Sequence, residues 1–207
     1  DVPAVVLEGR RHHPDVDIRF GSPLGVSRQL VATLGSSLEA VGGRRLPLVV
    51  IARGTSDPDA NGEAAKAARL LAEWNGSPFH LLAFTGVTGP SVPEVLDVAG
   101  RLGIGRLAVA FWFLCTGLLV ERARQQVAAF AAGGRTVVDA GYLGPCAEVA
   151  ALAVERFHQA LAGRPEVNCD ACAYRAPWPG REERVGQPMG VGHSHLAAAH
   201  RHRGDPG

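Results

Sequence analysis

Short apolar stretches alternate with longer amphipathic stretches through most of the chain. The apolar stretches predict strands at residues 46–52, 79–84, 106–113 and 136–140. Between and after them, apolar residues recur at helical spacing and predict helices at residues 60–74, 91–102, 117–132 and 146–162. Strands that alternate with helices of this length indicate βαβ units with right-handed crossovers. The sequence therefore predicts an α/β fold with a doubly wound parallel sheet that is covered on both faces.

The first 45 residues predict a helix at 2–12, a short strand at 17–20, a Gly-Ser-Pro-Leu-Gly turn and a second helix at 27–41. Residues 17–41 resemble residues 135–161, because both contain a strand, a Leu-Gly turn and a helix. Each segment looks like the closing βα unit of a lobe. We therefore expect residues 46–163 to form one complete lobe and residues 1–45 to be the end of a preceding lobe. Roughly 70 to 90 residues of that lobe would lie upstream.

Residues 164–207 are rich in Pro, Gly, Arg and His and show little periodicity, so we expect a disordered, His-rich tail. The only methionine is Met189, so Asp1 is not expected to be a natural translation start.

Composition narrows the range of partners. A formal net charge of +1 without blocks of like charge argues against a broad nucleic-acid interface, so an anionic ligand must meet local arginines. No apolar run is long enough to span a bilayer and no leader opens the chain, so we expect a cytoplasmic protein without a membrane partner. A homo-oligomer is compatible with the sequence.

Ligands of doubly wound sheets bind at the carboxyl ends of the strands, where Arg53, Thr85, Phe113 and Gly141 are expected. The loop that begins Arg53-Gly54-Thr55 lies between a strand and a helix, so its backbone N–H groups and Arg53 could receive an anion. In the alternative interpretation, Thr55 and Asp57 only shape the turn and cap the helix. Ser22 is a similar candidate for ligand binding, with ordinary turn chemistry as its alternative.

Cysteine and histidine spacing suggests a metal site in the tail. Cys169 and Cys172 are separated by two residues, and two such thiolates can bind one soft metal ion. Imidazole ligands would come from four nearby histidines: His193, His195, His200 and His202. The alternative is an inert tail motif. Cys115 and Cys146 lie among apolar neighbours and are predicted to be small core residues.

Four motifs, in this order, carry a family resemblance: VVIARGTSDPDANGEAAKAARLL, AFTGVTGPSVPEVLD, FWFLCTGLLVERA and CDACAYR. They resemble the two-lobed sirohydrochlorin cobaltochelatase/ferrochelatase family of class II chelatases. The resemblance implies insertion of Co²⁺ or Fe²⁺ into the tetrapyrrole sirohydrochlorin, in cobalamin or siroheme biosynthesis, with the divalent metal as substrate. Sirohydrochlorin carries many carboxylates, so we expect the candidate residues Arg53, Gly54, Thr55 and Ser22 to contact it.

The same resemblance implies that this lobe lacks the metal ligands. An active lobe of the family starts with a His-Gly-Ser/Thr loop and adds a Glu after its second strand and a His after its third. The matching positions here are Arg53, Gly86 and Leu119, none of which can hold a metal or accept a proton. No catalytic residue is therefore expected in this chain, and the chain alone should be inactive. The alternative function is a non-catalytic tetrapyrrole- or metal-binding module.

Some long members of the family carry a cysteine motif for an iron–sulfur cluster at the position of Cys169 and Cys172. Two thiolates fall short of the four that a cluster normally takes, so a cluster here would need further ligands.

Overall fold

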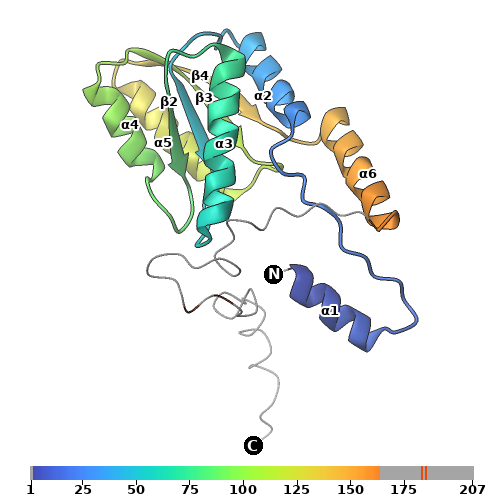
Figure 1. The fold of residues 1–207 in the computed structure, drawn as a ribbon. Coiled ribbons are helices and arrows are strands. Elements are labelled where there is room, and N and C mark those ends of the chain that lie inside the picture. The colour runs from blue at the N-terminus through green and yellow to red at the C-terminus, as the bar shows by residue number, and fades with distance from the viewer. Residues whose placement is uncertain (1, 164–182, 184, 186–207) are drawn as a thin grey trace, which may run out of the picture. The chain divides into compact units, whose positions relative to one another are not determined.

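A four-stranded parallel sheet organises the chain in the computed structural model, which describes residues 2–163, 183 and 185. Its strands are β1 (Leu48–Ala52), β2 (His80–Phe84), β3 (Arg106–Trp112) and β4 (Thr136–Tyr142), in the order β2-β1-β3-β4 (Figure 1). Each crossover contains one helix: α3 (Pro58–Asn75), α4 (Val92–Arg101) and α5 (Leu118–Ala132). The predicted doubly wound α/β fold is confirmed.

The sheet separates two hydrophobic cores. Alternate residues of a strand point to opposite faces, and β1 is buried along its whole length. Leu48 and Val50 pack in the core that includes α2 (Arg28–Ala40) and α3. Val49 and Ile51 pack in the core formed with α4 and α5. This two-sided burial explains why the strand sequence is continuously apolar.

The remaining helices are α1 (Val2–His12) and α6 (Ala147–Leu161). Contacts divide the chain into two units, one of residues Pro23–His158 and one of residues Asp1–Ser22 with residues Gln159–Gly207. The first unit contains the sheet and is the one that carries the candidate site. No helix among the described residues is long and apolar enough to cross a membrane.

The predicted strand at residues 17–20 is wrong. This segment is not in a strand, and the four strands of the sheet all come from residues 48–142. Its polar contacts involve side chains instead: Arg10 Nε donates to the Ile18 carbonyl over 2.7 Å, and Arg19 pairs with Asp17 and donates to the Leu161 carbonyl. An extended segment needs a neighbouring strand to satisfy its backbone, and the sequence pattern alone does not reveal whether one is present.

Candidate functional site at the carboxyl end of the sheet

The loop after β1 satisfies most of its own hydrogen bonds. The backbone N–H of Thr55 donates to Asn61 Oδ1 over 2.9 Å, and Asn61 Nδ2 donates back to the Thr55 carbonyl over 2.8 Å. Asp57 donates its N–H to Thr55 Oγ1, and its carboxylate accepts the N–H of Asp59 at the start of α3. These bonds are the ones that the turn-and-cap interpretation requires. They leave fewer backbone N–H groups for an anion than the sequence suggested.

Arg53 is the charged group that this loop presents to solvent. It is the first residue after β1 and is exposed, and its side chain forms no ion pair or hydrogen bond with the part of the chain that the structure describes. Its backbone is fixed, because the Thr85 hydroxyl lies 3.4 Å from the Arg53 carbonyl and the Thr85 N–H donates to the Ala52 carbonyl over 3.0 Å. The side chain of Arg53 can therefore approach an anion from a rigid base.

Gly54 and Gly86 are places where the loops after β1 and β2 approach closely. Gly54 has φ of 76°, in the left-handed region that favours glycine, and a Cβ there would lie 2.8 Å from Thr88 Cγ2. A Cβ on Gly86 would lie 2.5 Å from the Arg53 carbonyl oxygen. A carboxylate-bearing residue at position 86 would therefore require a different loop arrangement.

Exposed apolar side chains follow β2 and β3. The exposed fractions are 76% for Val87, 42% for Leu114 and 87% for Leu118. Strand ends of a parallel sheet meet at one edge, so these side chains and Arg53 belong to the same edge. This apolar surface was not predicted from the sequence, although apolar residues just after strand ends are a signal for it.

Two cysteines differ from the predicted core role. Cys115, in the loop after β3, is exposed, and Cys146 is partly buried. The prediction is wrong for Cys115 because β3 ends at Trp112 and the next residues leave the core before α5 begins.

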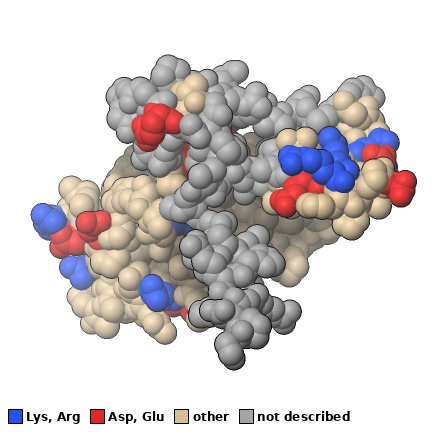
Figure 2. All heavy atoms as spheres, turned by 90° about the horizontal axis from the view of Figure 1, so that it is seen from below, with Lys and Arg blue, Asp and Glu red and all other residues tan. Residues whose placement is uncertain are grey.

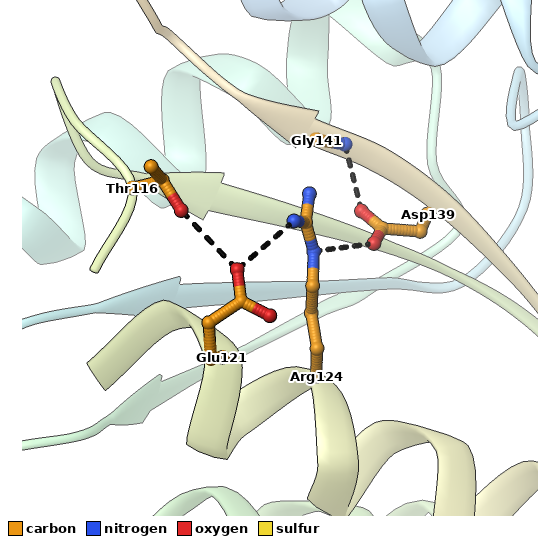
Figure 3. A network of polar contacts seen from close by, with 5 residues as sticks. All are labelled: Thr116, Glu121, Arg124, Asp139 and Gly141. Atoms are coloured by element: carbon orange, nitrogen blue, oxygen red, sulfur yellow. Dashed lines mark hydrogen bonds and ion pairs between the residues drawn. The ribbon is translucent and has the colours of Figure 1, made fainter. Parts of the chain in front are cut away.

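A polar network links α5 to β4 (Figure 3). Arg124 Nε lies 3.1 Å from Asp139 Oδ2, and Asp139 Oδ1 accepts the Gly141 N–H over 2.7 Å. Glu121 lies 3.7 Å from Arg124 Nη1 and accepts the Thr116 hydroxyl over 3.2 Å. The network therefore joins the loop before α5 to the end of β4.

This network accompanies an irregularity in β4 that the sequence did not predict. We expected the strand to end at residue 140, but it continues to Tyr142, with a register shift against β3 and φ of 75° at Gly141. The shift pairs Tyr142 with Phe111, and Arg124 lies 5.8 Å from the Tyr142 ring centroid. Tyr142 is thus held, partly buried, at the carboxyl end of β4.

The structure brings together three of the predicted substrate-contacting residues, Arg53, Gly54 and Thr55. Ser22 is partly buried and belongs to the other unit. The six predicted metal ligands of the tail lie outside the described residues: Cys169, Cys172, His193, His195, His200 and His202.

Leu119, at the start of α5, is partly buried. Within the described part of the chain, no group of three or more His, Cys, Asp and Glu side chains could hold a metal ion. On the face shown in Figure 2, basic and acidic side chains are interspersed and do not separate into patches.

Comparison with known proteins gives one consistent picture. A family model described as CbiX matches residues 47–160. A sirohydrochlorin cobaltochelatase of Priestia megaterium is 30% identical over 182 residues, which are 84% of this chain and 60% of that protein. A sirohydrochlorin ferrochelatase of Bacillus subtilis (strain 168) is 26% identical over 147 residues, which are 70% of this chain and 56% of that protein.

Solved structures agree on the fold. A structure described as SirB from Bacillus subtilis with Fe³⁺ has a TM-score of 0.68 at 23% identity and covers 78% of this chain and 65% of its own. A cobalt complex of the sirohydrochlorin chelatase SirB from Bacillus subtilis subspecies spizizenii has a TM-score of 0.64 at 20% identity, covering 83% of this chain and 65% of its own. The chain therefore spans about 60% of the length of the curated relatives that it matches.

Proposed function

Because the chain belongs to the CbiX family, we propose that it contributes the non-chelating lobe of a two-lobed enzyme that inserts Co²⁺ or Fe²⁺ into sirohydrochlorin. In this proposal residues 46–163 form that lobe, residues 1–45 end a preceding lobe, and residues 164–207 form a tail. Insertion replaces two pyrrole N–H protons by one divalent metal ion, so the enzyme must hold the metal, orient the ring and accept the protons. The preceding lobe would supply the ligands and the base.

One observation carries the proposal: an exposed arginine and exposed apolar side chains share the ligand-binding edge of the sheet. Arg53 is exposed there, with Val87 and Leu118 exposed by 76% and 87%. A tetrapyrrole with carboxylate substituents has an apolar ring and an anionic rim. Arg53 can pair with the carboxylates of the rim, and the apolar side chains can pack against the ring. Gly54 and Thr55 would shape the loop, and Ser22 stays a separate prediction of a tetrapyrrole contact.

The assignment of catalysis to another lobe rests on what occupies the three matching positions. Arg53 is cationic, Leu119 has no lone pair, and Gly86 lies where a Cβ would be 2.5 Å from a carbonyl oxygen. The same facts favour the second candidate, a binding module that holds tetrapyrrole or metal without catalysis. In either case we propose that Cys169, Cys172 and the four tail histidines bind the divalent metal and store or deliver it.

The two candidates are separated by an absorbance assay of Co²⁺ insertion into sirohydrochlorin. We expect no protein-dependent formation of the metallated product with the 207-residue chain, and clear formation with the full-length gene product. Product formation by the 207-residue chain would contradict the absence of chelating groups from this lobe. An inactive full-length product that still binds sirohydrochlorin would support the binding module.

A further inference from the structure

Helices α2 and α6 occupy equivalent places in an internal repeat. Leu24-Gly25 precedes α2 and Leu143-Gly144 precedes α6, and each helix begins three residues after its glycine. The two glycines share a left-handed conformation, with φ of 62° at Gly25 and 61° at Gly144. The agreement extends the turn and the helix of the sequence repeat to the backbone, but not its strand.

Helix α2 is buried on the sheet of this lobe. It contributes Leu30, Val31, Leu34 and Leu38 to the core, each with at most 4% of its surface exposed. It packs against α3 and β4 (Figure 1). The contact with α3 is close, because a Cβ on Gly35 would meet the Trp74 ring at 2.2 Å. Yet α2 lies before residue 47, where the match to the family model begins, whereas α6 lies almost wholly within that match.

Helix α6 carries apolar residues at the positions that α2 buries, but here all of them except the partly buried Val149 are exposed. Aligned on the Leu-Gly turn, the buried residues of α2 correspond in order to Val149, Ala150, Ala153, Val154 and Phe157.

Val154 and Phe157 are 54% and 58% exposed. The one residue of α6 that is fully buried is Leu152. At about 100° per residue, Val154 and Phe157 are turned roughly 140–160° away from Leu152. Helix α6 therefore has one apolar side toward its own lobe and a second apolar stripe that stays exposed.

We infer that the stripe Ala150, Val154 and Phe157 docks on the sheet of a second lobe of this family in the same gene product. It would dock there as α2 docks on the sheet described here. The inference rests on the two-lobed arrangement proposed above. A second copy of this chain is a poorer occupant, because α2 already covers the equivalent sheet face. The required polypeptide exists in the relatives, since the match covers only 60% of the Priestia megaterium protein.

The test compares the full-length gene product with the 207-residue chain. Amide exchange in α6 should be slower in the full-length product by on the order of a hundredfold, as expected for burial of one Val and one Phe side chain. The double substitution Val154→Glu with Phe157→Glu should remove that protection and lower the guanidinium midpoint of the full-length product. In the 207-residue chain it should leave the midpoint unchanged. The matched control is Val98→Glu with Leu102→Glu, at two residues of this lobe that are 42% and 62% exposed.

Three outcomes would overturn the inference: equal exchange of α6 in both proteins, a double substitution as harmless as its control in the full-length product, or a gene product without a second lobe. A loss of stability in the 207-residue chain itself would also overturn it, because the stripe would then be buried already. These readouts do not depend on Co²⁺ insertion, so an inactive enzyme with a protected α6 would refute the proposed function and leave this inference intact.

Discussion

Replacing Gly86 by alanine tests whether this lobe can accept a side chain where the family resemblance implies a glutamate. The added Cβ would lie 2.5 Å from the Arg53 carbonyl oxygen and 3.1 Å from that of Gly54. Both neighbours are backbone atoms, so neither can move aside without shifting the loop after β1. Gly86 does not have a positive φ, so the cost is steric and not a matter of backbone conformation.

Insertion of a carbon into a tightly packed place typically costs about 1–3 kcal/mol. Replacement of glycine by alanine restores roughly 0.4–1 kcal/mol by restricting the unfolded chain. We therefore expect Gly86→Ala to lower the free energy of unfolding by about 1–2 kcal/mol. With guanidinium m-values for a domain of this size, the midpoint should fall by roughly 0.2–0.5 M.

The assay is guanidinium unfolding followed by circular dichroism. Gly105→Ala is the matched control, because a Cβ there meets nothing within 4 Å and Gly105 also lacks a positive φ. It should leave the midpoint unchanged or raise it slightly. If Gly86→Ala is as stable as Gly105→Ala, the close approach of the two loops is wrong, and with it the structural reason for the missing carboxylate.

Three further predictions concern stability and metal binding. Leu38→Ala should lower the free energy of unfolding by about 2–5 kcal/mol because Leu38 is fully buried. Phe157→Ala, at the equivalent but exposed position, should change it by less than about 0.5 kcal/mol in the 207-residue chain. Equal losses of stability in denaturant titrations would contradict the difference in burial. Burial, reinforced by Arg69, lowers the pKa of His80 below its usual 6.5. The unfolded chain therefore binds this proton at a higher pH than the folded chain, and the free energy of unfolding should fall as pH drops through 6.5. Denaturant unfolding at several pH values should show a smaller fall for His80→Gln, and the same pH dependence in both proteins would refute this role of His80. A chain ending at Gly163 should keep its fold and lose most of its divalent metal in calorimetric titrations, while unchanged stoichiometry and affinity would place the metal site outside the tail.

The sequence was sufficient for the fold because its strongest signals are local and periodic. Continuous apolar runs such as Leu48–Ala52 identify strands buried on both faces, and the structure confirms them. The strand expected at residues 17–20 had only two apolar residues, Ile18 and Phe20, and it has no neighbouring strand in the described sheet. Pairing between distant segments is not encoded in a local pattern. The end of β4 was not predicted for a similar reason, because its extension depends on an irregularity that Asp139 and Gly141 form together.

The sequence predicted where the candidate site lies on the sheet, but not its hydrogen bonds or the exposure of its side chains. Arg53 lies at the expected carboxyl end of β1, because the βαβ pattern fixes that edge. The hydrogen bond between the Thr55 N–H and Asn61 could not be predicted. Asn61 lies one helical turn into α3, and no sequence signature marks a side chain there as the partner of the preceding loop. The exposure of Cys115 likewise depends on where the chain leaves the core after β3.

The central claim is that the carboxyl edge of this sheet holds the tetrapyrrole through Arg53. The most direct measurement is a titration of the 207-residue chain with metal-free sirohydrochlorin, comparing the parent chain with Arg53→Ala and with Arg106→Ala. Arg106 is exposed at the first residue of β3, at the opposite edge of the sheet, and serves as the control. A charge-assisted hydrogen bond contributes about 1.5–3 kcal/mol, so Arg53→Ala should weaken binding by about tenfold or more while Arg106→Ala binds as the parent does. If Arg53→Ala keeps its fold and its full affinity for sirohydrochlorin, the arginine is only a turn residue and the ligand-binding edge has been assigned incorrectly.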